Sequence, residues 1–179
     1  WQHVLSFLPP ALAAWPLILE ERGQIDIAER RNRTLRKQAA TAPLLYGERP
    51  VIAAGSTGSI PATAELLKAI AALPRGAVVL PGLDTTLNAK QHEMLIDGAN
   101  TQGHPQYGLA KLLRALGAGI ADVEELAGES PRTTIVRHAL APTEQTAAWT
   151  TARATIAADL DAALAGVSIL AAPNLDVQA

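Results

Sequence analysis

The chain has 179 residues, a formal net charge of −2 and no cysteine. This length suffices for one domain or two small lobes, and an apolar content of 49% is enough to fill a core. The near-neutral charge excludes a global field that attracts polyanions, so any contact with nucleic acid requires a local basic patch. The lack of cysteine excludes disulfides, thiol catalysis and cysteine-based zinc or iron–sulfur sites.

The N-terminus shows no signal peptide, and no apolar stretch approaches the roughly 20 residues that a membrane span needs. We therefore expect a cytoplasmic protein without membrane contact. The sequence starts at Trp1 rather than at methionine and ends shortly after an apolar run. We expect it to be an internal piece of a longer protein.

The first predicted elements are helices within residues 1–42. An apolar stripe from Leu5 to Leu12 contains Pro9–Pro10, which is expected to break or kink the helix. Gly23 is expected to end this helical segment, because glycine tolerates the left-handed conformation of a C-cap.

A second helix is predicted over residues 27–40. Asp26 can cap its N-terminus, and Glu29, three residues later, completes the pattern of a capping box. A linker with two prolines and a glycine is expected to follow over residues 41–50.

The second helix carries five basic residues, of which Arg30, Arg33 and Lys37 share one face. This basic stripe is the candidate surface for contact with DNA phosphates. The alternative is a solvated face without a ligand, which is common for charge runs. In that case the cations would pair with nearby acids, namely Glu20, Glu21 and Glu29.

Residues 50–84 predict a strand, a turn, a helix and a second strand. Val51–Ala54 and Ala77–Leu80 are apolar without alternation, which is typical of parallel strands covered on both faces. A helix is predicted over Pro61–Leu73, with Ser59 as its N-cap. A strand–helix–strand unit of this length implies a right-handed crossover between parallel strands.

The remaining sequence predicts short helices and two further strands. The expected helices cover residues 88–97, 109–116, 122–127 and 143–164, and the expected strands cover residues 133–136 and 167–171.

A turn of five small residues follows the first predicted strand and opens the helix; it consists of Gly55, Ser56, Thr57, Gly58 and Ser59. Free N–H groups and the helix dipole make such a turn suitable for phosphate. The turn lacks the lysine of a Walker A loop and the GxGxxG pattern. Two interpretations stay open, a structural turn and a contact with an anion or ligand.

Asp84 ends the second strand, where catalytic acids are often found in open α/β sheets. A turn residue or helix cap is the alternative. Trp15, Trp149 and Tyr107 are candidates for stacking on bases or, alternatively, for anchoring a core or an interface. The four histidines lack the spacing of a metal site and Ser56 lacks a GxSxG context, so neither a metal nor hydrolase chemistry is predicted.

Several phrases of the sequence resemble the AddB family of alphaproteobacterial type. They are WPLILEERGQIDIAERRNRTL, PVIAAGSTGSIPATAELLKAIAALPRGAVVLPGLD, HPQYGLAKLLRALG and ALAPTEQTAAW. The resemblance covers nearly the whole chain. It implies a subunit of the AddAB helicase–nuclease, which processes DNA double-strand breaks for recombination, with AddA as the partner subunit.

The resemblance also implies an α/β fold with a partial RecA-like parallel sheet, as in P-loop NTPases and superfamily 1 helicases. In those helicases the first strand ends in acids of the form DExQD and the second in GDxxQ. Here these places hold Gly55–Ser59, without an acid, and Pro81–Asp84, without a glutamine. Without the acids nothing holds Mg²⁺ or orients water for phosphoryl transfer. The expected region is therefore non-catalytic and without a cofactor.

By the same resemblance, residues 1–42 would form a helical segment of the 1B type. Residues 43–130 would finish the first RecA-like lobe and residues 131–179 would begin the second. The expected role is to scaffold the partner subunit and contact single-stranded DNA in double-strand-break repair. Two alternatives remain, a nucleotide-binding enzyme domain that uses Gly55–Ser59 as a phosphate loop, and a pure protein-interaction scaffold.

Overall fold

The computed structural model describes residues 2–99, 101–126, 128–141, 147 and 149–168. The chain divides into two compact units. The first consists of residues 1–102 and 106–123, and the second of residues 103–105 and 124–179. Among the described residues, no helix is both long enough and apolar enough to cross a membrane.

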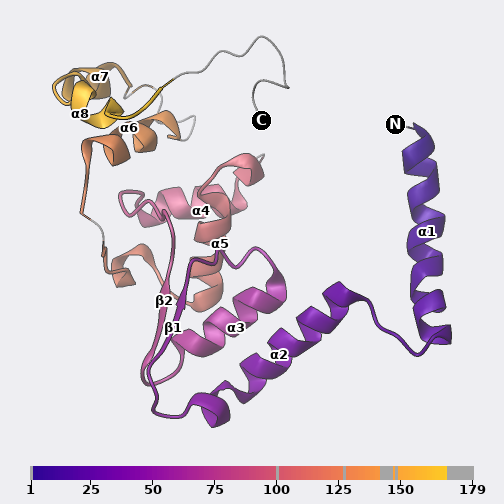
Figure 1. The fold of residues 1–179 in the computed structure, drawn as a ribbon. Helices are drawn as coiled ribbons and strands as arrows, with labels where there is room; N and C mark the ends of the chain where they lie inside the picture. Colours follow the sequence, from indigo (N-terminus) through magenta and orange to yellow (C-terminus); the bar gives the residue numbers. More distant parts are fainter. Residues whose placement is uncertain (1, 100, 127, 142–146, 148, 169–179) are drawn as a thin grey trace. The chain divides into compact units, whose positions relative to one another are not determined.

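The described elements are mostly helices, with one short parallel sheet (Figure 1). In chain order they are α1 (Gln2–Glu21), α2 (Ile27–Tyr46), β1 (Val51–Ala54), α3 (Pro61–Ala71), β2 (Gly76–Val79), α4 (Ala89–Asp97), η1 (Thr101–Gly103), α5 (Tyr107–Leu116), η2 (Ile120–Asp122), α6 (Pro131–Ala139), α7 (Trp149–Ala157) and α8 (Leu160–Leu164).

The first unit is built on the parallel pair of β1 and β2. Val51 pairs with Gly76 at one end of the ladder and Ala54 with Val79 at the other. The connection between the strands is α3, so the predicted strand–helix–strand unit is confirmed. Because the strands are parallel, both carboxyl ends lie at the same edge of the sheet.

Only one face of this sheet is covered among the described residues. Ile52 and Ala77 are paired neighbours and both are exposed, with 69% of Ile52 accessible to solvent. The expectation that both strands would be covered on both faces is therefore wrong for this part of the chain. In the part of the chain that the structure describes, α3 covers one face and the apolar side chain of Ile52 on the other face is exposed.

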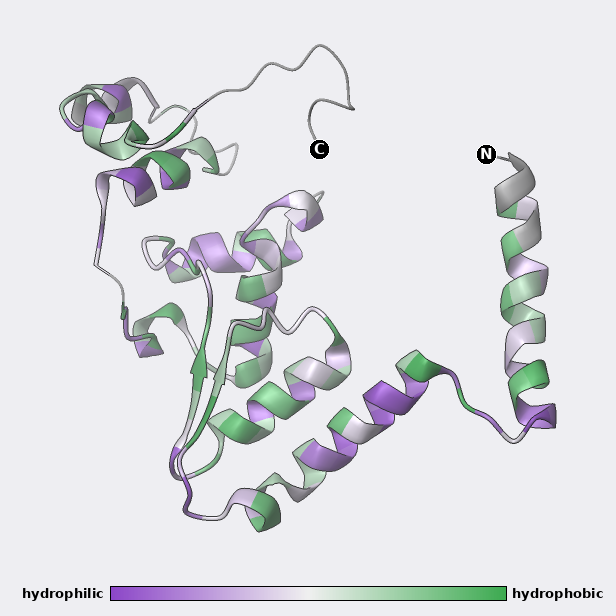
Figure 2. Cartoon of the chain, viewed as in Figure 1, coloured by the Kyte–Doolittle hydropathy of each residue, from purple (hydrophilic) through white to green (hydrophobic). Residues whose placement is uncertain are grey.

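The core of the first unit lies between α3 and its neighbours. Helix α2 packs along α3, and α5 packs against both α3 and α4. Figure 2 shows many hydrophilic residues along α2, whereas α3 carries more apolar ones. The buried apolar residues are Ala42, Ala62, Leu67, Ile70, Leu73, Leu87, Leu95, Leu109, Ala110, Leu112 and Leu113.

The N-cap of α2 agrees with the prediction only in part. Asp26 Oδ1 accepts a hydrogen bond from the Ala28 N–H at 2.7 Å, and its Oδ2 accepts one from Trp15 Nε1 at 3.1 Å. These hydrogen bonds hold the pKa of Asp26 below its ordinary value, the one from Trp15 most strongly. Glu29 was expected to complete a capping box, but its carboxylate accepts from Arg33 Nε at 2.7 Å.

Proline interrupts neither of the first two helices. Helix α1 continues through Pro9 and Pro10, where a break or kink was expected. Helix α2 contains Pro43 and runs six residues past the predicted end, into the expected linker. Burial of Ala42 and the hydrogen bond from Gln38 Nε2 to the Tyr46 hydroxyl, at 2.7 Å, stabilise this extension.

Ser59 is not the N-cap of α3, as was predicted. The N-cap is Ile60, whose side chain makes no capping hydrogen bond. Pro61 explains the shift, because it occupies the first helical position and so makes the preceding residue the N-cap. The predicted helices over residues 88–97 and 109–116 are confirmed as α4 and α5, and α4 has a full capping box from Asn88 and Gln91.

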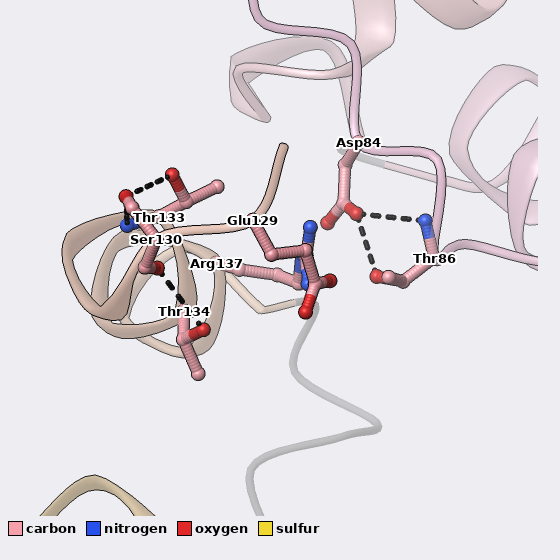
Figure 3. Close-up of polar contacts among 7 residues, drawn as sticks. All are labelled: Asp84, Thr86, Glu129, Ser130, Thr133, Thr134 and Arg137. Atoms are coloured by element: carbon pink, nitrogen blue, oxygen red, sulfur yellow. Dashed lines mark hydrogen bonds and ion pairs between the residues drawn. The ribbon is translucent and has the colours of Figure 1, made fainter. Parts of the chain in front are cut away.

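In the second unit, the strand predicted over residues 133–136 is instead part of helix α6. Ser130 Oγ accepts a hydrogen bond from the Thr133 N–H at 3.1 Å (Figure 3), and Pro131 occupies the first helical position. An N-cap followed by proline starts a helix strongly enough to override the β-branched residues. Helix α6 packs against α7 and α8, and Arg132 donates to the carbonyls of Ala163 and Ala165.

Three other predictions for the later chain need correction. The long helix over residues 143–164 is interrupted at Ala158–Asp159, between α7 and α8, and residues 143–146 and 148 lie outside the described part. Of the helix predicted over residues 122–127, Asp122 ends η2, residues 123–126 are not helical, and residue 127 lies outside the described residues. Of the strand predicted over residues 167–171, the first two residues are not in a strand and the rest lie outside the described residues.

The start of β2 is packed so closely that a side chain at Gly76 is expected to lower the stability of the chain. A Cβ on Gly76 would lie 1.8 Å from the Ile70 carbonyl oxygen. We expect Gly76→Ala to lower the free energy of unfolding by about 2–3 kcal/mol, the range of strongly overpacked sites. Gly108→Ala in α5 is the matched control, because its Cβ would meet nothing within 4 Å. Urea denaturation measures both, and equal stability of the two variants would contradict the packing.

Candidate functional site

The loop Gly55–Ser59 leaves the carboxyl end of β1 and leads into α3. Its first N–H, from Gly55, donates to the Val79 carbonyl at 3.3 Å and so extends the strand pairing by one residue. Gly55 and Gly58 have φ angles of 76° and 61°, in the left-handed region that favours glycine. The Gly58 N–H donates to Ser56 Oγ at 3.3 Å, which holds the loop in a tight turn.

Close packing against α5 gives a second structural reason for glycine at position 58. A Cβ at this position would lie 2.7 Å from Leu112 Cδ1, so the loop backbone rests directly on α5. None of the five loop residues is acidic, and the N-cap Ile60 offers no polar side chain to the first turn of α3. The chemistry of the loop is thus that of backbone N–H groups and hydroxyls, which suits an anion and not a cation.

Asp84, at the end of the second predicted strand, organises a turn (Figure 3). Its Oδ1 accepts hydrogen bonds from the N–H and the Oγ1 of Thr86, at 3.0 and 2.6 Å. The Asp84 N–H donates to Gln106 Oε1 at 3.0 Å, and Gln106 Nε2 donates to the Gly82 carbonyl at 2.9 Å. These contacts favour the interpretation of Asp84 as a turn residue.

His92, one of the four histidines for which no metal site was predicted, is buried, which the sequence did not predict. It lies in α4 with 8% of its surface exposed, and its Nε2 has no hydrogen-bond partner among the described residues. Desolvation lowers its pKa, while a backbone hydrogen bond to Asp84 and the charge of Asp84 act in the opposite direction. Leu95, three residues later on the same helix face and also buried, is the signal that could have revealed it.

The basic stripe of α2 divides into paired and unpaired cations. Arg33 forms an ion pair with Glu29 at 2.7 Å, as the interpretation of a solvated face requires. Arg30 and Lys37 are exposed, and neither forms an ion pair with another described residue. Two cations seven residues apart on one helix lie about 10 Å from each other.

The two tryptophans proposed for base stacking are not buried in a core. Trp15 is 50% exposed and Trp149 is 49% exposed. Tyr107 is half-buried, with Lys111 Nζ at 6.0 Å from its ring centroid. The stripe on α2, Gly55–Ser59 and Asp84 belong to the first unit, and Trp149 belongs to the second.

A metal centre finds no support in the part of the chain that the structure describes, where no three histidine, aspartate or glutamate residues are grouped to hold an ion. Comparison with protein-family models, curated proteins and solved structures gave no match.

The buried His92 predicts a pH dependence of stability. Because the folded-state pKa is lowered, the unfolded chain binds the proton more readily, and stability falls as pH decreases below the ordinary histidine value of about 6.5. Urea denaturation between pH 7.5 and pH 5 should show this loss in the wild type. His92→Leu should flatten the dependence, and an unchanged slope in this variant would contradict the assignment.

Proposed function

We propose that this chain is a non-catalytic, helicase-like region of an AddB-type subunit, which acts in the cytoplasm in the repair of DNA double-strand breaks. The observation that carries the proposal is the edge formed by the carboxyl ends of β1 and β2. A strand–helix–strand unit is present there, but the loop Gly55–Ser59 contains no acid and the Asp84 carboxylate accepts hydrogen bonds within a turn. Such an edge lacks the acids that hold Mg²⁺ and orient water in phosphoryl transfer.

The proposed contact with single-stranded DNA uses Arg30 and Lys37. Both are exposed on the face of α2 that also carries Arg33. A cation that forms no ion pair with another described residue binds a phosphate at a small cost in free energy, because no existing ion pair must be broken. The contact would position the strand electrostatically and would carry no base specificity.

The proposed scaffolding of the AddA partner is supported by apolar surface on α1. Leu5, Leu12 and Leu17 are each more than 60% exposed, and α1 also exposes Leu8, Trp15 and Ile18. A surface of this kind on one helix marks a protein–protein contact more often than a solvated face. A pure interaction scaffold, without DNA binding, is the alternative that this observation also favours.

The DNA role predicts a salt-dependent affinity for single strands that depends on α2. Arg30→Ala and Lys37→Ala should together weaken binding of a fluorescein-labelled oligothymidylate about tenfold at low salt and should reduce the salt slope. Fluorescence anisotropy measures the affinity.

Lys90→Ala, which removes a cation from α4, is the matched control and should have a smaller effect. If the α2 variants bind as tightly as the wild type, the basic stripe does not contact DNA. If the wild type binds no strand but retains a purified AddA-type partner, the pure scaffold replaces the present proposal.

The alternative of a nucleotide-binding enzyme rests on the first turn of α3, which has no side-chain cap from Ile60. A thermal-shift titration with Mg–ATP and Mg–ADP tests it. The proposal predicts no concentration-dependent rise in Tm, because the loop lacks the lysine of a Walker A loop and the edge lacks the acids that hold Mg²⁺. A saturable rise would show that Gly55–Ser59 binds phosphate and would overturn the non-catalytic assignment.

A further inference from the structure

A cavity of about 570 Å³ lies within the second unit, between α6, α7 and α8. Its walls are mostly the small or branched apolar side chains of these helices, among them Ile135, Ala152, Ile156 and Leu160. This volume falls in the range of sites that hold small organic groups. The helices around it pack mainly through α6, and Ala152 and Ala163 are buried in that packing.

The indole of Trp149, which lines the cavity, is held in place by a hydrogen bond. Trp149 Nε1 donates a hydrogen bond to the His138 carbonyl at 2.9 Å, which ties the start of α7 to the end of α6. About half of the indole, 49%, is still exposed. Because the polar atom is already bonded, the free part of the ring offers a π face and no donor.

The charged side chains that line the cavity are basic. Of its lining residues only His138 and Arg153 can carry a charge, and both are basic. Arg153 follows Trp149 by four residues, so the two share one face of α7 about 6 Å apart along the helix axis. Arg153 is exposed and forms no ion pair with any residue the structure describes.

We propose that this cavity accepts one base of single-stranded DNA, stacked on Trp149, with a neighbouring backbone phosphate on Arg153. The inference rests on the proposed DNA role and adds a second contact to it. An aromatic face beside a cation is the combination that binds single strands without sequence readout. Most of the walls are apolar, so stacking on Trp149 contributes most of the binding and the site distinguishes a strand with bases from one without them.

The test compares two labelled 12-mers with equal numbers of phosphates, oligothymidylate and a strand of abasic sites. Anisotropy should show that the wild type binds the thymidylate strand about tenfold more tightly. Trp149→Leu should reduce this preference to less than twofold, and Trp149→Phe, which keeps a ring, should retain most of it. Val136→Ala is the control, because Val136 is an exposed apolar residue of α6 that does not line the cavity, and it should leave the preference unchanged.

A second pair of variants guards against misfolding of the Trp149 variants. Ala157 is an exposed residue of the cavity wall, so Ala157→Leu narrows the cavity without removing a contact and should also abolish the preference. Arg153→Gln should weaken both strands to the same extent. Equal binding of both strands by the wild type would overturn the inference and leave the α2 phosphate contact intact. Failure to bind either strand would overturn both, and a preference that survives Trp149→Leu or Ala157→Leu would overturn the inference alone.

Discussion

The first unit depends on the packing of α3 between the sheet and the helices around it. Two strands of four residues do not form a stable sheet in water by themselves, so the parallel pair requires an apolar layer against it. Helix α3 supplies that layer through buried residues such as Leu67 and Ile70. The backbone of Gly76 meets the Ile70 carbonyl and that of Gly58 meets Leu112, so both ends of the crossover are held by close contacts.

This packing places the loop Gly55–Ser59 and the turn at Asp84 at one edge of the sheet. In an open α/β sheet this edge is the usual place for a ligand. Here the structure explains each part of the edge. Gly55 and Gly58 adopt left-handed φ angles, and the Asp84 carboxylate accepts a hydrogen bond from Thr86. Because this edge serves structure, the proposed contact with nucleic acid falls to other surfaces. These are the α2 cations that form no ion pair with another described residue, and the cavity beside Trp149.

The sequence predicted those elements whose signals are local and mutually consistent. The two apolar strands around a helix, the Asp26 cap and the helix before Gly117 were all found. Some predictions that rested on one residue type were wrong. Prolines did not end α1 or α2, and β-branched residues 133–136 form a helix because Ser130 and Pro131 initiate it.

The sequence predicted the positions of the candidate site residues but not the roles of their side chains. The sequence shows that Gly55–Ser59 contains no acid, but the role of Asp84 in its turn depends on Gln106, which lies 22 residues later and has no local signal. By contrast, the ion pair between Arg33 and Glu29 has a local signal, because the two residues lie four apart on one helix. Burial of His92 follows from the packing of α4 against α5, which periodicity suggests but does not establish.

The most direct test of the central claim is an amide NMR titration of the whole chain, first with single-stranded oligothymidylate and then with Mg–ATP. The account predicts that the amides of residues 30–37 shift with DNA, and that the amides of Gly55–Ser59 do not shift with Mg–ATP. Saturable shifts at Gly55–Ser59 with Mg–ATP, together with unchanged α2 amides in the presence of DNA, would contradict it.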